Sequence, residues 1–99
     1  MPEAAWRAAI DLEVRLGELG RARALYRRLL DRSAHVKVWL AAARFEAKVA
    51  QRAGDARGVL RRAYDYFKGL GVRGHESRAV IAEQWARFES AQARRSGLE

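Results

Sequence analysis

The feature that most restricts the fold of this 99-residue chain is an internal repeat of 33 to 34 residues. The pattern W-x6-E occurs at Trp6 and again at Trp39, which is 33 residues later. The stretch ARALYRRLL, which starts at Ala22, recurs 34 residues later as ARGVLRRAY at Ala56. We expect the extra residue to fall in the turn between two helices. A period of this length is typical of helical hairpins that bury their apolar faces by stacking on one another.

Apolar residues recur at the spacing of a helix face in five segments, and no segment shows the alternation of a strand. The expected helices are the stretch from Pro2 to a break bracketed by Gly17 and Gly20, residues 21–32, the stretch from an N-cap at Ser33 to Ala50, residues 56–68 and residues 76–94. The sequence therefore predicts an all-α fold of five helices joined by short connections.

We expect one array over residues 1–99, because the repeat runs through most of the chain. The predicted units are repeat 1 at 3–32, repeat 2 at 33–68, a glycine-rich loop at 69–74, and a partial third repeat with a tail at 75–99. The third copy is marked by RFE at Arg87–Glu89, which repeats Arg44–Glu46. About two and a half hairpins would stack into an α-α superhelix, or solenoid.

The repeated tryptophans lie on the stripe that the first helix of each hairpin must bury. Base stacking by Trp6 and Trp39 is the functional alternative, but core packing is the stronger interpretation. The predicted repeat core consists of Trp6, Ile10, Leu25, Tyr26, Leu29, Leu30, Trp39, Leu60 and Tyr64.

Two glutamates share the face of the buried stripe and require partners, because an unpaired carboxylate is costly to bury. Each repeat offers an arginine at the start of its second helix. We therefore predict ion pairs within each repeat, Glu13 with Arg23 and Glu46 with Arg57. A catalytic carboxylate pair is a poor interpretation, because the two glutamates lie a repeat apart.

The chain carries 20 Lys and Arg against 12 Asp and Glu, a formal net charge of +8. Such a surface favours polyanions or acidic protein patches. Two repeated pairs, Arg27–Arg28 and Arg61–Arg62, are predicted to point outward and could align as a basic ridge. Solvated helix faces are the stronger interpretation, so RNA contact is expected to be secondary.

The sequence lacks the residue patterns of several kinds of functional site. There is no cysteine, which excludes disulfides and thiolate sites, and His35 and His75 have no partner at metal-ligand spacing. Glycines 69, 71 and 74 match G-x-G-x-x-G, but they follow a helix rather than a strand. We expect no catalytic residue, cofactor or metal. No apolar run approaches the ~20 residues of a membrane span, so we expect no membrane contact.

The stretch LYRRLLDRSAHVKVWLAAARFE, Leu25 to Glu46, resembles the crooked neck-like family of pre-mRNA splicing factors, in the C-terminal part of their array of half-a-TPR (HAT) repeats. The likeness extends over 6–64 and returns at EQWARFE, 83–89. The glycine-rich KGLGVRG departs from the family, which is usually charged there.

This resemblance implies a non-enzymatic scaffold of the spliceosome, associated with the nineteen complex in the nucleus, that binds other spliceosomal proteins through its HAT repeats. Two alternatives stay open. One is a direct RNA-binding module that uses the arginine ridge. The other is a HAT scaffold of another RNA-processing pathway, such as mRNA 3′-end cleavage or rRNA processing.

The ends of the predicted array should expose apolar surface, because no further hairpin covers them. Trp85 and Phe88 of the last helix are therefore candidates for contact with a partner. Self-association through the exposed ends is a further expectation.

Overall fold

The computed structural model describes residues 3–32 and 35–97, which are mostly helical and contain no strand. The all-α prediction is thus confirmed, with five α-helices in the described ranges. The elements are α1 (Glu3–Arg15), α2 (Leu19–Arg32), α3 (Val36–Arg44), the π-helical η1 (Phe45–Val49), α4 (Ala53–Gly69), the 3-10 turn η2 (Gly71–Gly74) and α5 (His75–Gly97).

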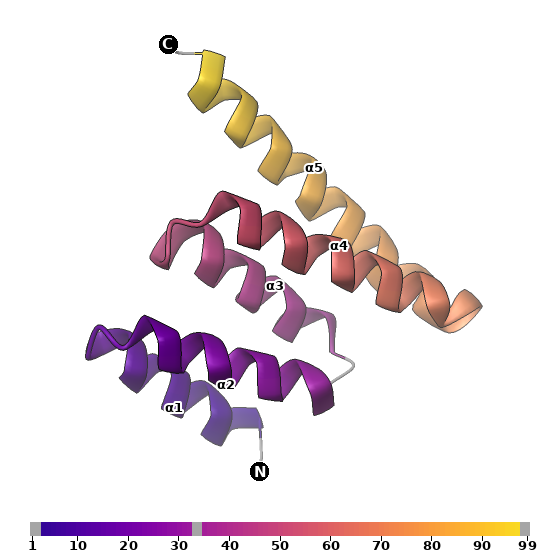
Figure 1. Ribbon diagram of the computed structural model, residues 1–99. Helices are drawn as coiled ribbons and strands as arrows, with labels where there is room; N and C mark the ends of the chain where they lie inside the picture. The colour runs from indigo at the N-terminus through magenta and orange to yellow at the C-terminus, as the bar shows by residue number, and fades with distance from the viewer. Residues whose placement is uncertain (1–2, 33–34, 98–99) are drawn as a thin grey trace.

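The helices are arranged as stacked antiparallel hairpins (Figure 1). Helices α1 and α2 form the first hairpin, α3 and α4 form the second, and α5 packs against α4 and α3. The molecule measures 40 × 38 × 15 Å, so it is one hairpin thick. Each hairpin consequently contacts only its neighbours, as in a helical repeat array. No helix of the described residues is long and apolar enough to cross a membrane.

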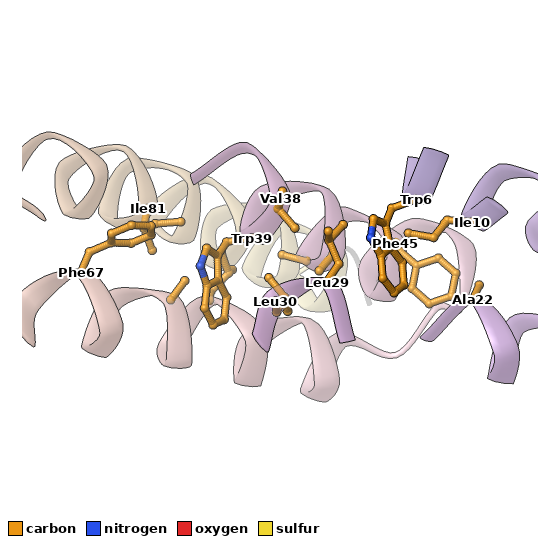
Figure 2. Close-up of a cluster of buried hydrophobic side chains, with 14 residues drawn as sticks. Trp6, Ile10, Ala22, Leu29, Leu30, Val38, Trp39, Phe45, Phe67 and Ile81 are labelled. Atoms are coloured by element: carbon orange, nitrogen blue, oxygen red, sulfur yellow. The ribbon is translucent and has the colours of Figure 1, made fainter. Parts of the chain in front are cut away.

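One continuous core runs along the stack and joins side chains from every α-helix (Figure 2). Six residues of the predicted core are buried: Trp6, Ile10, Leu29, Leu30, Trp39 and Leu60. The three others, Leu25, Tyr26 and Tyr64, are half-buried and pack against it. The largest fully buried side chains, Phe67 and Ile81, were not among the predicted residues.

Helix α1 ends in a Schellman motif, in which the left-handed position is usually a glycine. Gly17 has a φ of +76°, in the left-handed region that glycine adopts most easily. Its N–H donates to Val14 O, and the N–H of Glu18 donates to Glu13 O at 2.8 Å. The predicted break at Gly17 is therefore the end of α1, whereas Gly20 lies inside α2.

The second repeat is one residue longer because its first helix ends in a π-helical turn. We expected the extra residue in the interhelical turn, but that expectation is wrong: it is absorbed by η1, Phe45–Val49. The N–H of Arg52 donates to Glu46 O at 2.7 Å, spanning six residues where the corresponding bond in α1 spans five. The residue before it, Gln51, takes the left-handed φ of +56° that Gly17 takes in the first repeat.

The other predicted boundaries shift by a few residues. Helix α3 begins at Val36, after the extended backbone of His35; the predicted N-cap Ser33 and the predicted start at Pro2 lie outside the described residues. Most of the segment predicted as a glycine-rich loop, residues 69–74, is helical. Gly69 completes α4, and the 3-10 turn η2 leads directly into α5.

We predict that Gly74→Ala destabilises the fold and Gly58→Ala does not. A Cβ at Gly74 would collide with the backbone carbonyl of Phe67 at the end of α4, and overpacking of this kind costs ~1–3 kcal/mol. Gly58 lies within α4 with open space around it, so alanine there should gain roughly 0.5–1 kcal/mol of helix stability. Urea unfolding of both variants checks this; equal effects would contradict a steric role for Gly74.

Candidate interaction surfaces

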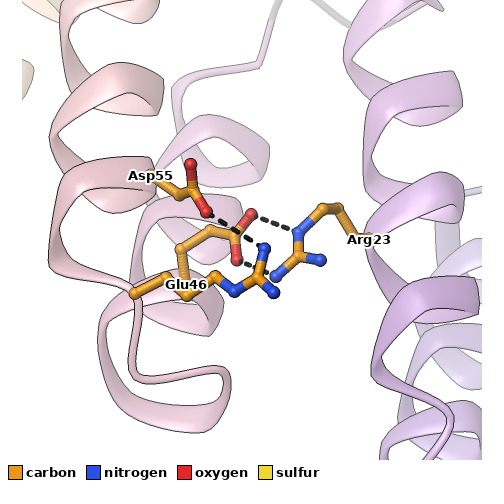
Figure 3. A network of polar contacts seen from close by, with 4 residues as sticks. Arg23, Glu46 and Asp55 are labelled. Atoms are coloured by element: carbon orange, nitrogen blue, oxygen red, sulfur yellow. Dashed lines mark hydrogen bonds and ion pairs between the residues drawn. The ribbon is translucent and has the colours of Figure 1, made fainter.

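Arg23 of α2 binds Glu46 of η1 and thereby ties the first hairpin to the second (Figure 3). Its Nε donates to Oε2 and its Nη2 to Oε1, both at 2.8 Å. The side chains are only 19% and 7% exposed. This two-bond geometry is the strong form of an arginine–carboxylate contact. The hydrogen bond to Glu46 raises the pKa of the Arg23 guanidinium above its ordinary value.

The same contact recurs one hairpin further along, between Arg57 of α4 and Glu89 of α5. The Nε–Oε2 distance is 2.6 Å and the Nη2–Oε1 distance is 2.8 Å. The indole Nε1 of Trp85 also donates to Glu89 Oε2, at 3.1 Å. Both side chains are nearly half exposed, at 46% and 43%, so this pair is more open to solvent than the first.

Both arginines also lie over a phenylalanine that directly precedes their glutamate. The guanidinium carbon of Arg23 is 6.0 Å from the centroid of the Phe45 ring. The corresponding distance from Arg57 to Phe88 is 5.5 Å. We call each set of arginine, glutamate and phenylalanine an inter-repeat clamp. The clamp combines an ion pair with a cation–π contact.

The predicted ion pairs within each repeat, Glu13–Arg23 and Glu46–Arg57, are wrong. Alanines at 22 and 56 are fully buried, and successive helical residues point about 100° apart. The arginine that follows each alanine thus leaves the buried face, and it reaches a glutamate of the next hairpin or of α5. Glu13 keeps a buried Oε2 without a hydrogen-bond partner among the described residues.

The predicted arginine ridge is partly used inside the molecule. All four arginines are exposed, but the second of each pair covers the tryptophan of its own repeat. Arg28 lies 5.5 Å from the Trp6 ring centroid, and Arg62 lies 5.9 Å from that of Trp39. For Arg27 and Arg61 the described residues show no such ring contact, so these two arginines are the freer members of the predicted ridge.

A groove of about 360 Å³ lies between the first helix of the second hairpin and α5. Figure 1 shows the C-terminal half of α5 diverging from α3 and α4. Apolar side chains, among them Leu60 and Phe88, line this basic groove. Four exposed cations also line it, and no carboxylate does: Arg44, Lys48, Arg87 and Arg95.

Trp85 and Phe88, the two aromatic residues predicted to contact a partner, lie in different surroundings. Phe88 is half-buried and lines the basic groove. Trp85 is also half-buried, but its ring packs edge-on against Tyr64 at 6.3 Å. Trp85 thus contributes to the joint between α4 and α5, and Phe88 is the aromatic residue that a molecule in the groove would meet.

Two residues of the clamps, Phe45 and Glu89, were absent from the predicted sites, and Phe88 was predicted only as a residue that contacts a partner. The repeated RFE at 44–46 and 87–89 was the signal that could have found them. Among the described residues, no cluster of three or more His, Cys, Asp or Glu could hold a metal ion.

The chain is similar to pre-mRNA splicing factors over nearly all of its length. It is 33% identical, over its whole length, to "Pre-mRNA-splicing factor CLF1" of Pyricularia oryzae. It is 36% identical over 90% of its length to "Crooked neck-like protein 1" of Homo sapiens, and 34% identical over 90% to "Pre-mRNA-splicing factor cwf4" of Schizosaccharomyces pombe. The predicted resemblance is confirmed. That the matched segment is the C-terminal part of the array stays a prediction.

The match covers a small part of each relative: 16% of the Pyricularia protein, 10% of the human protein and 15% of the Schizosaccharomyces protein. No family model matches the chain, and no solved structure matches it.

We predict that Arg23→Ala destabilises the chain by about 3 kcal/mol, because it leaves Glu46 buried without its cation. Glu13→Gln at the matching position of repeat 1 should change stability by less than about 0.5 kcal/mol, because no ion pair is lost. Thermal and urea unfolding of the two variants measures the difference. A large loss of stability from Glu13→Gln, together with a small loss from Arg23→Ala, would instead support the predicted ion pairs within each repeat.

The second clamp should make stability depend on pH. The hydrogen bond from Arg57 is the main cause of a lowered pKa of Glu89, and the hydrogen bond from Trp85 lowers this pKa further. A carboxyl with a lower pKa in the folded state stabilises the fold above its unfolded pKa of about 4.3, and this contribution is lost as pH falls through the folded pKa.

Glu89→Gln should therefore be less stable than the parent at pH 7. The difference in stability should shrink as the pH falls below the unfolded pKa and through the folded pKa of Glu89. Urea midpoints measured from pH 7 to pH 2 test this. Glu83→Gln is the control, because the Glu83–Arg87 pair is an exposed contact within one helix and should contribute little at either pH. A parent–variant difference that stays constant with pH would contradict the role of Glu89.

Proposed function

Because the chain is related over nearly its whole length to the crooked neck-like pre-mRNA splicing factors, we propose that it is a non-enzymatic scaffold of the splicing machinery. In this proposal it acts in the nucleus, within the spliceosome and its nineteen complex, and holds other spliceosomal proteins through its HAT repeats. The observation that carries the proposal is the identity of 33–36% with splicing factors over 90–100% of the chain.

The shape of the molecule supports a scaffold role. A stack one hairpin thick presents long, continuous surfaces relative to its mass, and such surfaces suit extended peptides or helices of a partner. The chain spans only 10–16% of the relatives named above. The role proposed here is therefore that of a segment that binds, and not the whole activity of those proteins.

We propose the basic groove as the partner site and an acidic amphipathic helix as its occupant. The apolar lining, with buried Leu60 and half-buried Phe88, suits the apolar face of a helix. The four cations along the groove suit carboxylates on the flanks of that helix, since complementary charge sets orientation and association rate. Arg87 is already held by Glu83 at 2.9 Å, so Arg44, Lys48 and Arg95 are the cations available to a partner.

RNA binding by the arginine ridge is the competing proposal. Its support is reduced because Arg28 and Arg62 lie over the tryptophans of their own repeats. A ridge that depends on phosphate contacts would give binding that falls steeply with salt. Recovery of partners that is lost after ribonuclease treatment would favour this alternative.

We predict that the tagged chain recovers spliceosomal proteins from nuclear extract, and that Arg44→Glu with Lys48→Glu lowers the recovery about tenfold, the effect of ~1.4 kcal/mol. The matched control is Arg15→Glu with Arg21→Glu, which changes the net charge equally at exposed positions outside the groove. The control should retain the partners. If the parent chain recovers no splicing protein, the splicing role is contradicted. If both variants lose the partners equally, the proposal that the basic groove binds them is contradicted.

A further inference from the structure

The basic groove widens along its length, and its positive charge is concentrated at the wide end. Its two walls, α3 with η1 and α5, run in the same direction, and α5 diverges from α3 toward its C-terminus (Figure 1). Leu40 and Gln84, which come first in the two walls, therefore line the narrow end. Lys48 and Arg95, which come last, line the wide end. Both walls thus end on the basic side of the groove.

The cations that a ligand can reach lie toward that wide end. Arg87, in the middle of the α5 wall, is already bound by Glu83 at 2.9 Å. Arg44, Lys48 and Arg95 are exposed, and no carboxylate is among the described residues that line the groove. A ligand that carries carboxylates should therefore place them between Lys48 and Arg95, since complementary charge sets its orientation.

The space between the walls is hollow because small side chains line it, Ala43 and Ala47 on one wall and Ala91 on the other. The space measures about 360 Å³. A cavity of about 150 Å³ holds one benzene ring, so the groove has room for about two apolar groups of that size. A ligand must bring these large side chains itself, and two of them share one face of a helix when they are one turn apart.

The length of the groove matches a short stretch of helix. The walls rise by ~12 Å from Leu40 to Lys48 and by ~16 Å from Gln84 to Arg95, at ~1.5 Å per residue. One helical turn rises ~5.4 Å, so about two to three turns of a ligand helix fit between the ends of the groove.

The direction of such a helix follows from its charges. Carboxylates are favourable in the first turn of a helix and unfavourable in the last, because the N-terminal end of the helix dipole is positive. A helix that begins at the wide end brings these carboxylates to Lys48 and Arg95. It also places its positive end beside the C-terminal, negative ends of the two walls. The opposite direction would lose both of these interactions.

We propose that the basic groove binds the first two to three turns of a partner helix that runs antiparallel to α5. Carboxylates in its first turn lie between Lys48 and Arg95, and two large apolar side chains one turn apart fill the space over Ala43, Ala47 and Ala91. This inference rests on the groove of the proposed function, and it adds the direction of the bound helix and the order of its residues.

The test compares two synthetic peptides of about three turns that have the same composition. The acid-first peptide carries its carboxylates in the first turn, and the acid-last peptide carries them in the last turn. A side-chain staple on the solvent face keeps both helical, because carboxylates in the last turn alone would lower helicity. By fluorescence anisotropy, the chain should bind the acid-first peptide at least about tenfold more tightly, a difference of ~1.4 kcal/mol. Replacing its two large apolar residues by alanine should weaken binding by a similar factor.

Lys48→Glu with Arg95→Glu should abolish the preference for the acid-first peptide. The matched control, Arg15→Glu with Arg21→Glu, should retain it. Equal affinity of the parent chain for the two peptides would overturn the direction but leave the groove as the partner site. If neither peptide binds while recovery from nuclear extract still depends on Arg44 and Lys48, the order of residues proposed for the partner is overturned and the splicing role stands. Tighter binding of single-stranded RNA, lost in the Lys48→Glu with Arg95→Glu variant, would overturn a helix as the occupant.

Discussion

The ion pair that passes from one hairpin to the next is the interaction on which this array depends. Arg23 and Glu46 lie largely out of water, where each alone would be strongly unfavourable. Apolar packing between helices tolerates small slips, but a two-bond guanidinium–carboxylate contact does not. The clamp therefore fixes how one hairpin sits on the next, while the tryptophans and leucines supply most of the buried apolar area.

The irregular repeat length coincides with the first clamp. The π-helical turn η1 contains both Phe45 and Glu46, the two residues that receive Arg23. The extra residue of the repeat therefore lies after Trp39, which is buried in the core. The left-handed Gln51 then closes the helix where Gly17 closes α1, so the second hairpin keeps its turn geometry without a glycine.

Much of the fold could be predicted from the sequence, because the repeat period and the apolar stripe are properties of single helices. The buried positions of Trp6, Trp39 and Leu60 follow from that pattern. The choice of ion-pair partners could not be predicted in this way. Two pairing schemes fit the three glutamates and two arginines equally well. Pairing within repeats leaves Glu89 without an arginine, and pairing between repeats leaves Glu13 without one. Only the direction of Arg23 from its helix decides between them.

The same geometry divides the positive charge into structural and available parts. Arg23, Arg28, Arg57 and Arg62 each lie over an aromatic ring of the array, so these four side chains are less free to turn toward a ligand, although the net charge of +8 is unchanged. The cations that remain include those of the basic groove, where apolar side chains accompany them. Phosphate backbones need charge alone, whereas a groove of mixed character suits a helix with one apolar and one acidic face. The distribution of charge, more than its total, thus favours a protein ligand over RNA.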